Sequence, residues 1–196
     1  MKLTTENAHL FWDGMCSQWV PIPITIDGIV YNCNEQYMMA MKAKLFGDEK
    51  IHTAIMYSNE PRNQKALGRE VVGFDPVKWN EVCRLVVYRA NLAKFTQDKI
   101  AYDWLLDTGD KLIVEASPVD KIWGIGLHQS KAEAWDTEKW QGKNWLGEAI
   151  MQVRSDIKQL GLSPVDKITK DKVISFPNGE FKIESEGSVK ISGRIK

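Results

Sequence analysis

A glutamate near the start of a predicted helix is the first residue whose position suggests chemistry. The stretch 32–46 (NCNEQYMMAMKAKLF) predicts a helix with Asn34 as its N-cap and Glu35 in its first turn, where the helix dipole favours negative charge. A carboxylate held there could face an electron-poor carbon, or Glu35 could be an ordinary first-turn acid beside methionines that fill the core. One helix face is expected to carry four residues at helical spacing: Met38, Met41, Lys42 and Leu45.

A second acid follows the apolar run 112–115 (LIVE), which is typical of a buried strand. In the loop EASPVDKIWGIGL after it, Asp120 and Trp123 lie three residues apart, and Gly124 allows the backbone to approach another group closely. Loops that leave strand ends often form ligand sites. Asp120 could instead only cap a turn, and the single GxG lacks the third glycine of a dinucleotide fingerprint.

Metal and thiol chemistry are not expected. His52 and His128 have no neighbouring ligand residues in the sequence. The three cysteines lack metal-ligand spacing and a histidine partner, which fits free thiols in a reducing cytoplasm. We therefore expect a cytoplasmic protein without a metal or other cofactor.

Composition excludes several classes of protein. The 196 residues suffice for one domain with a sizeable core, and Lys+Arg and Asp+Glu are both 26, so the formal net charge is zero. Broad electrostatic attraction to nucleic acid or an anionic membrane is not indicated. The sequence has neither an apolar run that could span a bilayer nor a signal-peptide layout at its start. Eight tryptophans could include some that stack on a flat heterocycle.

Strand and helix signals alternate along the chain and predict an α+β fold that is mainly helical. A hairpin is expected around Asp27-Gly28, and Asn144 is expected to cap the last helix. Polar residues 128–142 could be a mobile lid or, more simply, a surface loop. Further helices are predicted after Asp48, from Pro61 to Gly68, from Pro76 to about Thr96 and over 99–107.

The character of the sequence changes after Ser163-Pro164. Residues 163–196 predict a three-strand β meander with Asn178-Gly179 as a hairpin turn. So short a meander buries little alone, so we expect it to pack on the main domain (1–162), on a partner or on its copy in a homo-oligomer.

The opening helix and the SPVDKIWGIG loop together resemble the NADAR family of YbiA-like N-glycosidases. The resemblance extends over residues 11–154 and includes FW, PITIDGIVYNCNEQYMMAMKAKLF, KALGREV, the helix ending in NLAKF, LLDTGDKLIVEASPVDKIWGIG and GKNWLGEAIMQVR in this order. It implies a single, mainly helical domain with a small strand component. It also implies an enzyme that hydrolyses the bond between C1′ of a phosphorylated ribose and a base nitrogen.

The residues that the resemblance marks as functional are Glu35, Trp79 and Asp120, with Trp123 beside the last. Two departures concern the pocket: the chain has Ser17-Gln18-Trp19 where the family usually has Ser-Asn-Phe, and Gln36 stands where many members have His. These departures bear on the identity of the substrate more than on the type of reaction.

Cleavage of a C1′–N bond builds positive charge on the ribose, which nearby carboxylates stabilise while one of them activates water. We expect Glu35 and Asp120 to meet in one cleft, with Asp120 nearer the water and Trp79 or Trp123 stacked on the base. Phosphate could be held by a subset of six cations, of which Arg89 and Lys94 are the first choices: Lys42, Lys44, Lys65, Arg69, Arg89 and Lys94.

Two substrate classes follow from the resemblance. One is ADP-ribose linked to guanine in nucleic acid, as in reversal of a toxin or of phage defence, and the other is the ribosylaminopyrimidine phosphates of riboflavin synthesis. Zero net charge argues mildly against binding long DNA through many phosphates, although a small basic cleft could take one flipped base. The compact resemblance and the extra C-terminal meander favour the first class slightly. A non-catalytic module that binds ADP-ribose or a nucleotide is the alternative to an enzyme, and a purely structural protein is a third possibility.

Overall fold

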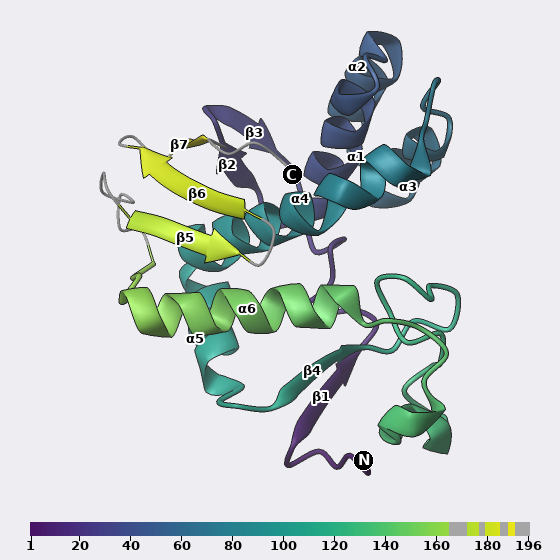
Figure 1. Ribbon diagram of the computed structural model, residues 1–196, viewed down its shortest axis with the longest axis vertical. Coiled ribbons are helices and arrows are strands. Elements are labelled where there is room, and N and C mark those ends of the chain that lie inside the picture. Colours follow the sequence, from purple (N-terminus) through teal and green to yellow (C-terminus); the bar gives the residue numbers. More distant parts are fainter. Residues whose placement is uncertain (165–171, 177–178, 185–187, 191–196) are drawn as a thin grey trace.

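The structure is a computed structural model, and it describes residues 1–164, 172–176, 179–184 and 188–190. As expected, helices predominate and the sheets are small (Figure 1). The helices are α1 (Asn34–Leu45), α2 (Glu49–Tyr57), α3 (Pro61–Arg69), α4 (Pro76–Gln97), α5 (Lys99–Asp107) and α6 (Trp145–Leu160). The strands are β1 (Ala8–Phe11), β2 (Ile24–Ile26), β3 (Ile29–Tyr31), β4 (Leu112–Glu115), β5 (Lys172–Phe176), β6 (Gly179–Glu184) and β7 (Ser188–Lys190).

Helix α4 is the centre of the fold and packs against α1, α5, α6 and β2 (Figure 1). Asp75 caps its start with hydrogen bonds from the N–H groups of Val77 and Lys78, and Pro76 takes the first turn, as predicted. The second half of α4 is buried on all sides. This explains why its sequence is not amphipathic there: neighbouring elements cover every face.

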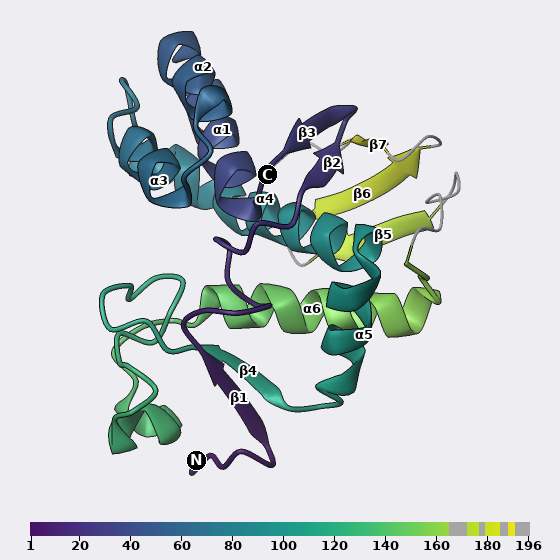
Figure 2. The same cartoon turned by 180° about the vertical axis from the view of Figure 1, so that it is seen from behind.

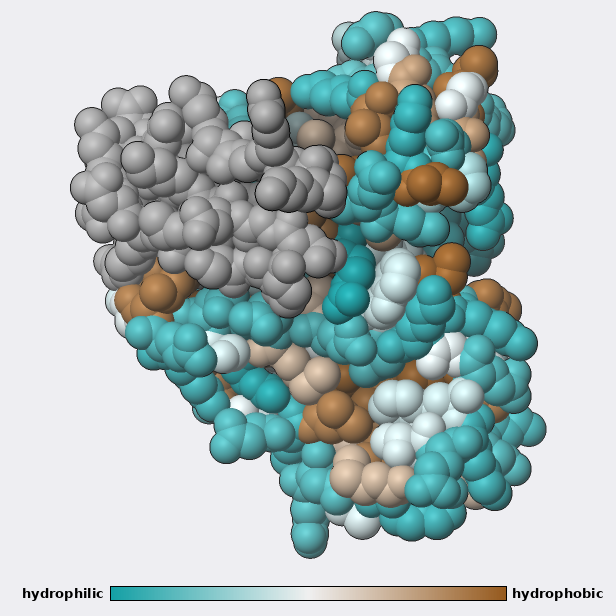
Figure 3. All heavy atoms as spheres, in the orientation of Figure 1, coloured by the Kyte–Doolittle hydropathy of each residue, from teal (hydrophilic) through white to brown (hydrophobic). Residues whose placement is uncertain are grey.

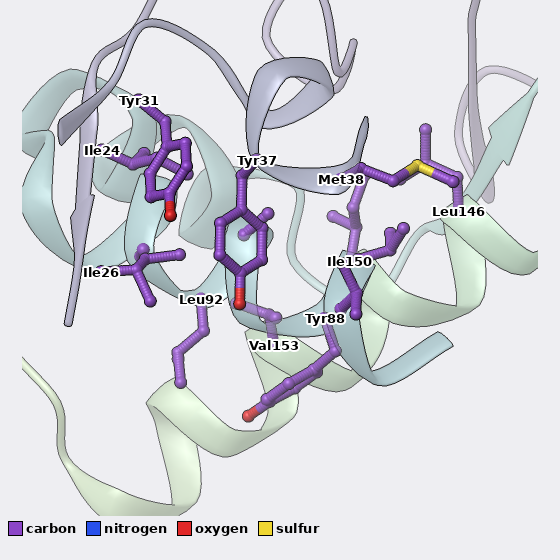
Figure 4. Close-up of a cluster of buried hydrophobic side chains, with 14 of the residues drawn as sticks. Ile24, Ile26, Tyr31, Tyr37, Met38, Tyr88, Leu92, Leu146, Ile150 and Val153 are labelled. Atoms are coloured by element: carbon purple, nitrogen blue, oxygen red, sulfur yellow. The ribbon is translucent and has the colours of Figure 1, made fainter. Parts of the chain in front are cut away.

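The hairpin β2–β3 turns at Asp27-Gly28, as predicted, with both residues at positive φ. Ile24 and Ile26 point into the core beside Tyr37 of α1, and side chains of α4 and α6 complete the cluster (Figure 4). The hairpin therefore fixes how the chain enters α1.

Strands β1 and β4 form a parallel pair in which Ala8 faces Leu112 and Phe11 faces Glu115 (Figure 2). The prediction of a buried strand over 112–115 is confirmed, since Ile113 and Val114 are fully buried. Both strands end at the same edge, so the loop after β4 starts where the chain leaves β1.

The predicted buried face of α1 is wrong in part. The residues that are buried fill the first two turns on every side: Asn34, Glu35, Gln36, Tyr37, Met38, Met39, Ala40 and Ala43. Leu45, which was assigned to the apolar face, is 43% exposed. The reason is that α2, α3 and α4 all pack on α1, so burial follows distance from the helix start and not one stripe.

Residues 128–142 form turns and two short 3-10 helices, η1 (Ala132–Trp135) and η2 (Thr137–Lys139). The indole N–H groups of Trp135 and Trp140 donate to the carbonyls of Gln129 and Ala134 inside the same segment. Lys2 pairs with Asp136 at 2.7 Å and ties the segment to the N-terminus. These contacts fit the simpler expectation of a surface loop.

Strands β5, β6 and β7 pair antiparallel in chain order. The predicted turn at Asn178 lies outside the described residues. Separation of the chain at residues 162–163, and packing of the extension on the domain, a partner or a copy, stay predictions.

The face shown in Figure 3 is mainly hydrophilic, with exposed apolar side chains in separate small groups. Among the described residues, the structure contains no helix that is both long and apolar enough to cross a membrane.

Gly147, in the first turn of α6, tests how tightly this helix packs on β4. A Cβ there would collide with the carbonyl oxygen of Ile113 and the side chain of Asn144. The carbonyl group of Ile113 is held in the backbone and cannot move aside for a methyl group. We therefore expect Gly147→Ala to lower the free energy of unfolding, measured by urea denaturation, by about 2–4 kcal/mol.

Gly68→Ala in α3 is the matched control. A Cβ there meets the side chain of Met39, with the flexible sulfur as the nearest atom. Since that side chain can change rotamer, we expect a loss below about 1.5 kcal/mol. Equal losses in the two variants would contradict the assignment of Gly147 to a rigid contact.

Candidate functional site

Glu35 lies in the first turn of α1, as predicted, but it is buried, with 4% of its surface exposed. Its backbone N–H donates to the carbonyl of Gln18 (3.0 Å). The indole N–H of Trp19 donates to its Oε2 (3.3 Å). The segment around residues 18–19 therefore holds both ends of this residue.

Buried side-chain amides lock the start of α1 in place. The Asn34 amide donates to the side-chain oxygens of Gln18 and Asn91, each at 3.1 Å, and the Asn91 amide also donates to Gln18 (3.1 Å). The prediction of Asn34 as N-cap is wrong: Cys33 takes that position without a side-chain cap, and Asn34 belongs to the helix. Asn34 instead joins α1 to α4.

Asp120 uses its two carboxylate oxygens differently. Its Oδ1 accepts the backbone N–H groups of Ile122 (2.9 Å) and Trp123 (2.8 Å), which is the turn-capping role considered from the sequence. Its Oδ2 lies 3.7 Å from the ammonium nitrogen of Lys65 on α3. The capping bonds thus orient a carboxylate whose other oxygen faces a cation.

A third acid, Glu115, ends β4 a few residues before Asp120. Its backbone N–H donates to the Asn144 side chain (2.9 Å), whose amide donates in turn to the carbonyl of Ile113 (2.9 Å). Its Oε2 is buried and has no hydrogen-bond partner among the residues that the structure describes. Burial raises the pKa of Glu115 to about 8, and the negative charges of Asp120 and Glu35 add to this rise. The positive charge of Lys65 opposes it.

The charges of Asp120, Lys65 and Arg69 act on Glu35, and those of Asp120, Lys65 and Glu35 act on Glu115. Burial raises the pKa of Glu35 to about 7. The charge of Lys65, the Trp19 hydrogen bond and the charge of Arg69 oppose this rise, and the charge of Asp120 adds to it. Glu35, Asp120, Lys65 and Arg69 were all singled out from the sequence, and the structure brings them together.

Lys42 and Lys44 lie at the other end of α1, roughly 10 Å or more along the axis from Glu35 at 1.5 Å per residue. The Lys42 ammonium donates to the carbonyl of Gly68 (2.7 Å) and lies over the ring of Phe74. Lys44 is exposed. The structure therefore gives Lys42 a role in packing α1 on α3 and places neither lysine beside the acids.

Arg89 and Lys94, the first choices for holding phosphate, bind the protein itself. Lys94 is fully buried and donates to the carbonyls of Met15 (2.9 Å) and Ser17 (3.2 Å). Arg89 is 6% exposed on its side chain and pairs with Asp27 in the hairpin turn at 3.1 Å. Both were expected to bind phosphate. Their observed contacts are structural instead, because each cation holds a neighbouring segment in place.

Trp79 and Trp123, which were expected to stack on the base, differ in exposure. Trp79 is 8% exposed and belongs to the hydrophobic core. Trp123 is half-buried and packs edge-on against Trp145 at 5.9 Å between ring centroids. Gly124 is needed for close packing of the chain, because a Cβ there would lie 2.8 Å from the carbonyl oxygen of Glu115.

A groove of about 660 Å³ adjoins this cluster of acids at Trp19. It is lined by Trp19, Glu60, Pro61, Arg62, Asn63 and Ala66. Within the part of the chain that the structure describes, no group of three or more His, Cys, Asp or Glu side chains is arranged to hold a metal ion.

Sequence reasoning missed Glu115 as a site residue and treated Trp19 only as a departure from a pattern. The signal for Glu115 was an acid placed directly after three apolar strand residues and before the Asp120 loop. Nothing local in the sequence pairs Trp19 with Glu35, because the chain must first turn back through the hairpin.

A family model described as the NADAR domain matches residues 9–158. This chain belongs to the NADAR family. It is 43% identical over 158 residues to "N-glycosidase R617" of Acanthamoeba polyphaga mimivirus, covering 78% of this chain and 90% of that protein. It is 30% identical over 144 residues to "N-glycosidase YbiA" of Escherichia coli strain K12, covering 74% and 81%.

The solved NMR structure of Escherichia coli YbiA superposes on this NADAR domain with a TM-score of 0.67 at 25% identity, covering 86% of this chain and 95% of that one. A third relative, "Riboflavin biosynthesis protein VVA0006" of Vibrio vulnificus, is 25% identical over 146 residues. That match covers 74% of this chain and 36% of the relative.

The departure at Gln36 in this NADAR chain is a structural contact. The Gln36 amide is buried and donates to the carbonyls of Ile55 (3.1 Å), Met56 (3.2 Å) and Ser58 (3.1 Å) at the end of α2. Its side-chain oxygen accepts the N–H of Asn32 (2.7 Å). Gln36 therefore binds α2, whereas Trp19, the other departure, contacts Glu35 directly.

Burial of Glu35 predicts a specific dependence of stability on pH. Because the folded pKa is about 7 and the ordinary value is 4.5, the folded state holds a proton that the unfolded state has lost between these pH values. Stability of the wild type should therefore fall as pH rises from 4.5 to 7. We expect Glu35→Gln to raise the free energy of unfolding by up to about 3 kcal/mol near pH 8 and to change it little near pH 4.

Urea denaturation at both pH values measures this effect. Glu148→Gln is the control, because that glutamate is half-exposed and pairs with Arg84 on the surface. A gain in Glu35→Gln that is the same at both pH values would contradict the assignment.

Proposed function

We propose that this NADAR protein is an N-glycosidase that hydrolyses the bond between C1′ of a phosphorylated ribose and a base nitrogen. The observation that carries the proposal is that Asp120 pairs with Lys65 at 3.7 Å and that the charges of both act on Glu35 and on Glu115. The names of the mimiviral and Escherichia coli relatives support the same reaction class.

The arrangement suits the charge changes of this reaction. As the base departs, positive charge develops on the ribose ring, and a carboxylate nearby lowers the energy of that state. The water that attacks C1′ must lose a proton to a base of suitable pKa. Burial of the acids strengthens both effects, since electrostatic interactions are stronger where water is excluded.

We assign the proton transfer to Glu35. With a pKa of about 7, about half of this carboxyl group is deprotonated at neutral pH and can accept a proton. The Trp19 N–H donates a hydrogen bond to one of its oxygens. Asp120, with Oδ1 fixed by two backbone N–H groups, orients the ribose and stabilises the cation. This reverses the preference drawn from the sequence, which put Asp120 nearer the water.

Glu115 takes a different role in the proposal. With a pKa of about 8, it is mostly protonated at neutral pH, and its Oε2 has no partner in the described part of the chain. A protonated carboxyl can donate a hydrogen bond to a ribose hydroxyl. Its neutral state also avoids a third negative charge beside Glu35 and Asp120.

The substrate proposed is ADP-ribose linked to guanine in nucleic acid. The cations of α3 supply a small local site for phosphate, which fits a single modified base in a chain of zero net charge. The second candidate is a ribosylaminopyrimidine phosphate of riboflavin synthesis, which the name of the Vibrio vulnificus relative favours. Release of the free base from each substrate, followed by chromatography, decides between them.

Substitution of the acids tests the proposed roles. We expect Glu35→Gln and Asp120→Asn to lower kcat by at least ~100-fold on the better substrate, because each removes a negative charge used during the reaction. Glu115→Gln should retain activity within ~10-fold at neutral pH, because an amide also donates a hydrogen bond.

Single-turnover release of base is the measurement. Tight binding of ADP-ribose without release by the wild type or any variant would instead support a non-catalytic binding module. An equal loss in all three variants would contradict the separate role of Glu115.

The position of the cations gives a further prediction. Arg69→Ala should raise KM for a phosphorylated substrate by roughly 10-fold with little change in kcat, because a charge-assisted contact to phosphate is lost. Lys44→Ala is the matched control at the far end of α1 and should leave KM unchanged. An effect of Lys44→Ala as large as that of Arg69→Ala would place the phosphate elsewhere.

A further inference from the structure

The groove beside Trp19 is not used by the roles assigned above. Its 660 Å³ is large enough for a flat heterocycle, and 39% of the Trp19 surface is exposed. The same indole donates its N–H to Glu35, so one side chain belongs to the groove and contacts the general base. Whatever occupies the groove therefore lies next to the reacting bond.

We infer that this groove receives the departing base, with Trp19 as its stacking surface and with Glu60 and Asn63 at the polar edge of the base. The inference rests on the proposed hydrolysis and names the place of the leaving group within it. An indole ring can stack on any planar base, whatever the bases on either side of it in a strand. Stacking on Trp19 therefore requires no particular nucleic-acid sequence.

The residues of α3 separate the base from the sugar phosphates. Arg62 and Ala66, four residues apart, line the groove. Lys65 and Arg69, also four apart, form the neighbouring row of the same helix and act on Glu35 and Asp120. The groove carries one carboxylate, Glu60, and one guanidinium, Arg62, so their charges balance, whereas the second row consists of two cations. Phosphate therefore belongs to the second row and the base to the first.

Glu60 and Asn63 favour one kind of base edge. A carboxylate accepts hydrogen bonds only, and an amide both donates and accepts them. Guanine presents a ring N–H and an amino group side by side as donors, with a carbonyl next to them. An aminopyrimidinone carries the same edge. The groove thus fits the chemistry that the two proposed substrates share.

Direct binding tests the occupant without any turnover. The indole N–H of Trp19 gives one ¹⁵N–¹H resonance, which is assigned by its loss in Trp19→Phe. We expect 9-methylguanine and a diaminopyrimidinone to shift it, and ribose 5-phosphate to leave it in place. The Trp12 resonance is the control, since Trp12 is exposed and packs on His128 away from the groove. A shift with ribose 5-phosphate alone, or with none of the probes, would overturn the inference.

Kinetics test the two functions of Trp19 separately. Trp19→Phe keeps an aromatic ring but loses the N–H that favours the charged form of Glu35, so the acid limb of the kcat profile should move to higher pH while KM changes less than ~2-fold. Trp19→Ala should raise KM for the intact substrate by roughly 10-fold and leave the inhibition constant of free ADP-ribose unchanged. Trp12→Phe is the matched control.

The outcomes separate this inference from the proposed function. Loss of ADP-ribose inhibition in Trp19→Ala, in proportion to the rise in KM, would place the sugar phosphates in the groove and overturn the inference while hydrolysis stands. A wild type that shifts the Trp19 resonance with bases, yet releases none, would refute hydrolysis and leave the base site in place.

Discussion

Burial of a carboxylate at the start of α1 is the constraint on which the rest of the site depends. Taking Glu35 out of water costs free energy when it is charged, so the surroundings must fix it and supply compensating charges. They do so through the Gln18 carbonyl, the Trp19 N–H and the cations of α3. Glu35 is therefore held in an environment that raises its pKa to about 7.

The other two acids depend on how β4 meets α6. Asn144 adopts a left-handed backbone and its side chain bonds both to Glu115 and to Ile113, so the start of α6 holds the end of β4. Gly124 lets the following loop return close to Glu115. Asp120 is then fixed by its own turn. Asp120 and Glu115 both interact electrostatically with Glu35 at the start of α1.

The cations that were singled out from the sequence include buried groups that hold segments together and more exposed groups on α3. Lys94 and Arg89 on the central helix are buried and hold the 15–17 segment and the hairpin turn. Lys65 and Arg69 on the shorter helix α3 are more exposed: Lys65 pairs with Asp120, and the charges of both act on Glu35. The position of a cation near a sequence motif therefore says little about its role, because burial decides which groups it can reach.

The sequence by itself predicted most of the helices and strands and singled out Glu35 and Asp120 as candidate site residues. Local signals sufficed where the cause is local: Pro76 after Asp75 starts α4, Asp27-Gly28 turns the hairpin, and LIVE makes a buried strand. The resemblance to the NADAR family led to the prediction that Glu35 and Asp120 lie in one cleft. Only the tertiary structure decided that Glu115 interacts electrostatically with these two acids and that Trp19 donates a hydrogen bond to Glu35. It also decided that Lys94 donates to a backbone carbonyl. The physical reason is that these features depend on desolvation and on contacts between segments far apart in sequence, which no local pattern encodes.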